Sequence, residues 1–164
     1  MSYKVEKDWE SNGLRCVVIM TEMGHRCGYV GVSKEHMLYG VSYNDKVESL
    51  KGKLEELKES DVGKRGIMSL IGWNGETVSP EILFNVHGGL TYSGDSKEYP
   101  VESDLWWFGY DCAHHGDAKD LTMVSETIRK IEMGFPTYGV LRTLDYCIDE
   151  CESLAKQLFD LNSL

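Results

Sequence analysis

Long apolar runs are missing from this chain of 164 residues. The longest, Cys16 to Met20, is far shorter than the roughly 20 residues that cross a bilayer. The first residues also lack the apolar segment of a secretory signal. With only three prolines and no low-complexity segment, the composition is that of a folded domain. We therefore expect a cytoplasmic protein that has no membrane partner.

Positive charge is also scarce. The chain has 17 lysines and arginines against 27 aspartates and glutamates, which gives a formal net charge of −10. Nonspecific binding to nucleic acid polymers depends on neutralising phosphates, so this balance argues against DNA or RNA as a partner. A small enclosed nucleotide needs only a local group of donors, because distant carboxylates are screened over about 8 Å at physiological salt.

The cysteines are odd in number and lack metal-binding spacing. The five thiols include no Cys-x-x-Cys pair, so the sequence predicts neither a disulfide framework nor a zinc ribbon. Cys147 and Cys151 are one helical turn apart, which is typical of two core positions. Cys112 lies close to His114 in the sequence. Strand alternation, however, places Cys112 on the same apolar face as Phe108 and Tyr110, which favours a buried, inert thiol over a nucleophile. We expect reduced, mostly packed cysteines.

Hydrophobic periodicity predicts the main elements. Leu14 to Met20 and Cys27 to Val32 are rich in β-branched residues and are separated by a short loop, which indicates a hairpin. Apolar residues at steps of three and four predict helices over Lys46 to Ser60, Leu121 to Met133 and Thr143 to Leu161.

These elements define the expected fold class, α+β. We expect a mainly antiparallel β-sheet packed by a long C-terminal helix and one or two further helices. The length suits a single domain over residues 1–164. Within it, residues 42–79 are a candidate inserted helical excursion.

Two further predicted strands carry polar residues on one face. Alternation over Glu81 to Tyr92 places His87 and Thr91 on the polar face, and alternation over Leu105 to Cys112 places Asp111 on the face opposite the apolar one. If these strands are neighbours, the polar faces form a concave patch. Its expected parts are a floor of Gly89 and Gly109, a wall of Trp107, and the polar groups of Asn85, His87, Thr91 and Asp111.

The same stretch offers a mixed nitrogen and oxygen ligand set. Asp111, His114 and Asp117, with His87 from the neighbouring strand, would suit zinc, manganese or iron. No His-Glu-x-x-His helix and no zinc-deaminase signature accompanies them. The alternative is structural, with Asp111 and Asp117 capping the turn and accepting hydrogen bonds from His114 or His115.

A glycine cluster around the first hairpin is a second candidate site. Gly24 to Gly31 could expose backbone amides to an anion, with His25 and Arg26 as added donors, although a tight turn explains the glycines as well. The Gly-x-Ser-x-Gly elbow and the phosphate-cradling Gly-x-x-x-x-Gly-Lys loop are both missing. The sequence therefore disfavours a serine nucleophile and ordinary NTP hydrolysis.

Several longer motifs stand out along the chain. They are Cys27-Gly28-Tyr29-Val30, Leu38-Tyr39-Gly40, His87-Gly88-Gly89-Leu90-Thr91-Tyr92, Trp106-Trp107-Phe108-Gly109-Tyr110-Asp111-Cys112-Ala113-His114, Gly116-Asp117, Asp145-Tyr146-Cys147 and Glu150-Cys151-Glu152-Ser153-Leu154-Ala155-Lys156-Gln157-Leu158. In these motifs the chain resembles a family of small bacteriophage and prophage proteins that are usually labelled hypothetical. The resemblance brings no established activity. It implies a phage protein in the cytoplasm of the host cell, a setting similar to that of counter-defence proteins that sequester nucleotide signals.

The leading hypothesis is a phage counter-defence protein that sequesters a small nucleotide-derived immune signal, such as a cyclic nucleotide or an ADP-ribose derivative, without a cofactor. Its expected ligand-binding residues are Arg26, Tyr29, His87, Gly88, Gly89, Thr91, Trp107, Asp111 and His114. One alternative is a metal-dependent hydrolase or phosphodiesterase, with zinc or manganese held by His87, Asp111, His114 and Asp117. Another is an inhibitor that blocks a host protein by direct binding. Exposed apolar surface on the final helix would suit a homo-oligomer.

Overall fold

The fold is built on one five-stranded sheet. The computed structural model describes residues 2–47, 78–122, 124, 126–133 and 139–163. The sheet has the order β1-β2-β3-β5-β4, and every neighbouring pair is antiparallel. Its strands are β1 (Tyr3–Ser11), β2 (Leu14–Thr21), β3 (Arg26–Val32), β5 (Trp106–Asp111) and β4 (Tyr92–Gly94). The predicted hairpin and the predicted strand at the aromatic motif are confirmed, as is the α+β class.

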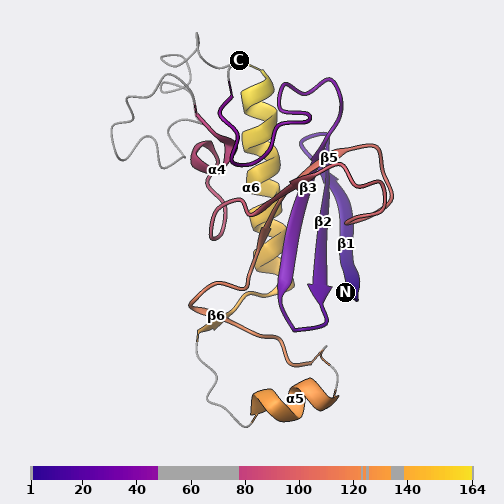
Figure 1. Cartoon of the computed structure of the whole chain (residues 1–164), viewed down its shortest axis with the longest axis vertical. Coiled ribbons are helices and arrows are strands. Elements are labelled where there is room, and N and C mark those ends of the chain that lie inside the picture. The colour runs from indigo at the N-terminus through magenta and orange to yellow at the C-terminus, as the bar shows by residue number, and fades with distance from the viewer. Residues whose placement is uncertain (1, 48–77, 123, 125, 134–138, 164) are drawn as a thin grey trace.

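A long helix, α6 (Leu144–Asn162), covers one face of the sheet (Figure 1). It begins at Thr143, whose side-chain oxygen accepts a hydrogen bond from the backbone nitrogen of Tyr146, as expected of an N-cap. Its apolar stripe is buried as the periodicity predicted, at Cys147, Cys151, Leu154, Ala155, Leu158 and Leu161. No helix in the described ranges is long and apolar enough to cross a membrane. Phe159 of α6 is 49% exposed, and the homo-oligomer stays a prediction.

Both faces of the sheet are covered. On the α6 side, Phe108, Tyr110 and Cys112 join the main core. On the other side, a second cluster forms from Val17, Ile19, Tyr29 and Trp107, covered by Tyr99, Val101 and Leu105 from the segment between β4 and β5. This double coverage explains why β2 reads as an unbroken apolar run.

The segment after residue 80 is not the strand that its alternation predicted. Pro80–Leu83 form a short helix, α4, and a turn follows in which the nitrogen of Gly89 donates to the oxygen of Val86 at 2.9 Å. Gly88 and Gly89 both have positive φ, +68° and +81°, which a strand does not accommodate. Only the last residue of the predicted strand, Tyr92, enters the sheet, as the first residue of β4.

Other differences lie at the edges of the fold. The half-exposed edge strand β1 was not predicted, because charged residues dominate it. The helix expected over Leu121 to Met133 is shorter, α5 (Glu126–Met133), and lies beyond the end of the sheet (Figure 1). Near it, β6 (Asp117–Ala118) and β7 (Val140–Leu141) form a parallel pair.

The predicted helix over residues 46–60 falls outside the described residues, apart from its first two. The two described residues on either side of it, Val47 and Val78, are neighbours in space, because the nitrogen of Val47 donates to the oxygen of Val78 at 2.9 Å. The inserted excursion stays a prediction.

Candidate functional site

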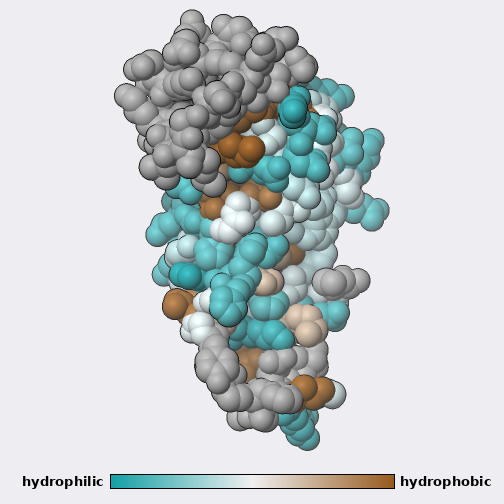
Figure 2. Space-filling view, turned by 60° about the vertical axis from the view of Figure 1, so that its left-hand side comes forward, coloured by the Kyte–Doolittle hydropathy of each residue, from teal (hydrophilic) through white to brown (hydrophobic). Residues whose placement is uncertain are grey.

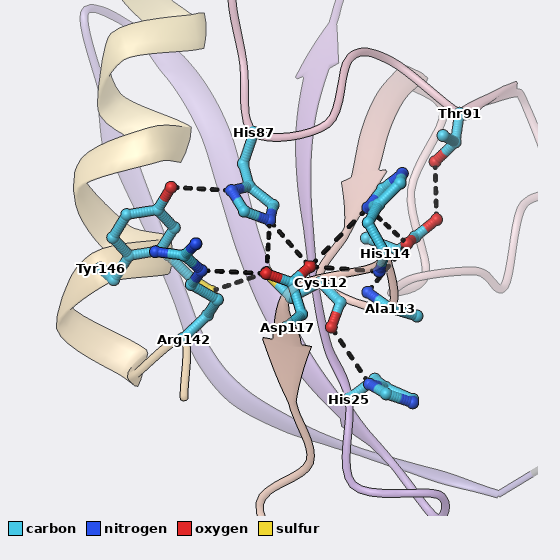
Figure 3. A network of polar contacts seen from close by, with 11 residues as sticks. His25, His87, Thr91, Cys112, Ala113, His114, Asp117, Arg142 and Tyr146 are labelled. Carbon is cyan, nitrogen blue, oxygen red and sulfur yellow. Dashed lines mark hydrogen bonds and ion pairs between the residues drawn. The ribbon is translucent and has the colours of Figure 1, made fainter. Parts of the chain in front are cut away.

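A buried carboxylate lies at the centre of a polar cluster where β6 begins (Figure 3). The Asp117 side chain is only 2% exposed. Its Oδ2 lies 2.9 Å from Nε2 of His87 and accepts from the backbone nitrogen of His114 at 3.1 Å, while its Oδ1 accepts from Nε of Arg142 at 2.9 Å. Burial alone would raise the pKa of this carboxyl, but the hydrogen bonds from these groups outweigh it and lower the pKa.

The imidazole of His87 bridges two elements. Its Nε2 faces Asp117, and its Nδ1 lies 2.8 Å from the phenol oxygen of Tyr146 in the first turn of α6. The loop that carries His87 is tied to the same helix by the buried Gln157, which accepts from the nitrogen of Asn85 at 2.9 Å and donates to its oxygen at 2.8 Å. The ring is therefore held at both nitrogens and through its backbone.

The imidazole of His114 lies beside the same carboxylate. Its Nδ1 is 3.3 Å from Oδ1 of Asp111 and 3.8 Å from Oδ2 of Asp117. This nitrogen is buried and has no correctly oriented hydrogen-bond partner within the described part of the chain. Its ring packs against the backbone of Gly88, where an added Cβ would be 2.4 Å from Cε1 of the ring. A glycine at position 88 thus makes room for His114.

Three of these side chains form a plausible donor set for a metal ion. One ligand atom each from His87, His114 and Asp117 can be chosen so that all lie within 4.8 Å of one another. Two ligands bound to one zinc ion at about 2.1 Å are separated by about 3.0–3.4 Å. The separation of 2.9 Å between His87 Nε2 and Asp117 Oδ2 is close to that span, and Nδ1 of His114 lies 3.8 Å from the same oxygen. Two imidazoles and a carboxylate suit zinc, manganese or iron.

The structure also places the fourth predicted metal ligand near this cluster. Asp111 reaches His114, and its Oδ2 accepts from Oγ1 of Thr91 at 3.1 Å. His87 contacts Asp117 and reaches Asp111 only through His114. The structure therefore brings His87 close to His114 and Asp117, as predicted. The predicted reason is wrong, because His87 lies in a loop and not on a strand paired with β5.

The expected wall of the patch, Trp107, is wrong, and so is the part of its floor assigned to Gly109. Trp107 is fully buried in the cluster on the opposite face, where its indole nitrogen donates to Oγ of Ser103 at 3.0 Å. Tyr29 is 4% exposed in that same cluster and hydrogen-bonds the phenol of Tyr99. Its ring fills the space over Gly109 that was assigned to a ligand.

Arg26 is also not available as an anion donor. It is 9% exposed, and its guanidinium pairs with Glu6 at 2.7 Å and Asp120 at 3.1 Å. A third bond runs to the backbone oxygen of Arg142 at 3.1 Å. Gly24 belongs to the turn, because its nitrogen donates to the oxygen of Thr21. The hairpin glycines therefore have a structural explanation.

Sequence reasoning missed Arg142 and Tyr146. Besides its bond to Asp117, the Arg142 guanidinium lies 4.9 Å from the centre of the Tyr146 ring. Tyr146 occurs in the motif Asp145-Tyr146-Cys147, which gave it no role, and no motif contains Arg142. Their one signal is their position around the N-cap Thr143, with Arg142 directly before it and Tyr146 three residues after it.

The thiols confirm the expectation of reduced, packed cysteines. All five are free, and Cys112 and Cys147 are buried with their sulfur atoms 3.6 Å apart. The contact with Cys147, together with burial, raises the pKa of the Cys112 thiol, which disfavours a thiolate nucleophile there.

Comparisons with protein-family models, curated proteins and solved structures gave no match. The resemblance to the phage family stays a prediction.

Proposed function

We propose that this chain binds a divalent transition-metal ion through His87, His114 and Asp117 and hydrolyses a phosphate ester of a nucleotide-type ligand. The supporting observation is that the three donors lie within 4.8 Å of one another, and that the buried Nδ1 of His114 makes no well-oriented hydrogen bond although Oδ1 of Asp111 lies 3.3 Å away. A polar atom buried without a partner costs free energy, and a bound cation would satisfy it. The ion would supply Lewis acidity for activating water.

The neighbouring side chains fit the role of supporting groups. For Nε2 of His87 to bind a cation, Nδ1 must carry the proton and donate it to an acceptor, and the phenol oxygen of Tyr146 lies in place at 2.8 Å. Arg142 would orient the Asp117 carboxylate through Oδ1, which leaves Oδ2 for the ion. Such partners keep both ligands in the geometry and protonation state that binding requires.

Replacing His114 with Ala tests the metal site. We expect the affinity for Zn²⁺ to fall by about tenfold or more, because a direct ligand costs at least as much as a supporting one. Isothermal titration of chelator-stripped protein with Zn²⁺ and Mn²⁺ measures this. His115→Ala is the matched control, because its imidazole is adjacent in sequence, exposed and outside the cluster. Equal Zn²⁺ affinity in both variants, or no binding by the unaltered protein, would reject the site.

The same protein separates hydrolysis from sequestration. Cyclic nucleotides and ADP-ribose are incubated with Zn²⁺-loaded protein, recovered after heat denaturation and weighed by mass spectrometry. Hydrolysis predicts a product heavier by one water in total, which His114→Ala does not form. Recovery of a retained but intact ligand would favour the phage counter-defence hypothesis and exclude the hydrolase.

A further inference from the structure

An open groove lies beside the residues that follow the proposed metal site along the chain. It has a volume of about 620 Å³ and is lined by Lys119, Asp120, Leu121, Thr122, Arg129 and Leu141. The β6–β7 pair ends where Ala118 pairs with Leu141. The groove begins there, because Leu141 and the residue after Ala118, Lys119, both line it. Asp117 is two residues from Lys119, which in extended backbone is about 7 Å. A ligand at the metal site could therefore extend into this groove.

Arg129 brings a positive charge to the groove. Its Nε donates to the oxygen of Leu121 at 3.1 Å and its Nη2 to the oxygen of Thr122 at 3.3 Å. These bonds fix the guanidinium without neutralising it, and no carboxylate pairs with Arg129 in the part of the chain that the structure describes. A guanidinium carries five N–H donors, so further donors are free for an anion.

The acidic residue of the groove does not oppose an anion strongly. Oδ2 of Asp120 pairs with Arg26 at 3.1 Å, and its Oδ1 accepts from both the hydroxyl and the backbone nitrogen of Thr122. Arg26 also pairs with Glu6 at 2.7 Å, so it offsets Asp120 only in part, but the lining carries two cationic residues, Lys119 and Arg129, against this one carboxylate. In a chain of net charge −10, the groove is a local exception.

Apolar side chains line the rest of the groove. Leu121 and Leu141 contribute to it, and Leu141 is 43% exposed. Ile131 and Val140 of the same region are 58% and 57% exposed. Figure 2 shows hydrophobic groups among hydrophilic ones at this lower end of the molecule, where Figure 1 places β6 and α5. Cationic and apolar groups side by side suit an amphipathic anion.

We propose that this groove binds the second half of a nucleotide that carries at least two phosphate groups. Arg129 contacts the phosphate distant from the metal site, and Leu121 and Leu141 pack against the base or sugar. This inference rests on the proposed function, because it names the substrate class of that site. It makes Arg129 a specificity-determining residue and not a metal ligand.

The apparent affinity for two probes tests the groove, measured as a Kd or, where the Zn²⁺-loaded protein hydrolyses the probe, as a KM. ADP-ribose is long enough to enter it, and 4-nitrophenyl phosphate is not. In Arg129→Ala we expect the Kd for ADP-ribose to rise about tenfold or more, as for the loss of a charge-assisted hydrogen bond. The Kd values for 4-nitrophenyl phosphate and Zn²⁺ should stay unchanged. Lys130→Ala is the matched control, because its ammonium is 77% exposed and pairs with Glu126.

The outcomes separate this inference from the proposed function. An unchanged Kd for ADP-ribose in Arg129→Ala, an equal loss for both probes, or no binding of ADP-ribose by the unaltered protein would overturn the groove. In each of those cases, a loss of Zn²⁺ binding in His114→Ala would still support the proposed metal site. Conversely, an Arg129-dependent Kd for ADP-ribose in protein that binds no Zn²⁺ would remove the metal site and keep the groove as an anion site.

Discussion

Replacing Asp117 with Asn should lower the free energy of unfolding by about 2–4 kcal/mol at neutral pH, since breaking a buried ion pair leaves its partners unpaired. The carboxylate is 2% exposed and accepts from His87, Arg142 and the backbone of His114. An amide has one acceptor oxygen and would direct an N–H toward these donors. Urea denaturation in the presence of a chelator measures the loss without a contribution from bound metal.

The effect of this substitution should depend on pH. The hydrogen bonds lower the pKa of Asp117 from its ordinary value of 3.8, so the unfolded chain takes up this proton first as the pH falls. The stability that the carboxylate contributes is therefore complete above about pH 5 and is lost as the pH falls through the folded-state pKa. The gap between the unaltered protein and Asp117→Asn should shrink below pH 4.

Asp111→Asn is the matched control. Its carboxylate is 33% exposed and lies beside the same His114 ring. Its Oδ1 accepts from the nitrogen of Ala113 at 3.0 Å, a bond that an amide oxygen can keep. We expect a loss of less than about 1 kcal/mol, as is usual for an exposed ion pair. Equal losses in the two variants would show that Asp117 is not the centre of the cluster.

Much of the sheet and the last helix was predictable from periodicity. β2, β3 and β5 are short apolar stretches whose two faces are both covered, and α6 has one apolar stripe on its packed face, so local sequence and tertiary environment agree. The segment before β4 misled this reasoning. Phe84, Val86 and Leu90 alternate and are buried as predicted, yet their backbone is irregular and is tied to α6 by Gln157. In this segment the alternating pattern correctly predicted which residues are buried, but it did not predict that the backbone stays outside the sheet.

The candidate site was predictable in part for a different reason. His87, His114 and Asp117 were selected by residue type near glycine turns, and such turns direct side chains toward one another. Trp107 was assigned to the site by strand face, and Tyr29 was included with the glycine cluster of the first hairpin. A period of two tells which residues share a face, but it does not tell that the segment between β4 and β5 covers that face. Arg142 and Tyr146 required knowledge of where α6 begins in space.

Replacing Gly88 with Ala should disrupt the site more than any other substitution of a single methyl group. The added Cβ would lie 2.4 Å from Cε1 and 2.7 Å from Nδ1 of His114, so the ring must leave its present position beside Asp117 or the loop must shift. The positive φ of +68° adds backbone strain of about 1–2 kcal/mol for a residue with a Cβ. We expect the affinity for Zn²⁺ to fall by about tenfold or more, as for the loss of a ligand.

Gly89→Ala separates the steric effect from the backbone effect. Gly89 has a similar φ of +81°, but nothing lies within 4 Å of an added Cβ. Both variants should therefore lose similar stability to backbone strain in urea denaturation, and Gly88→Ala should lose more because of the displaced imidazole. Only Gly88→Ala should lose Zn²⁺ affinity in calorimetric titration. Equal Zn²⁺ affinities in the two glycine variants would mean that the position of the His114 ring does not control metal binding, and the three-donor site would have to be abandoned.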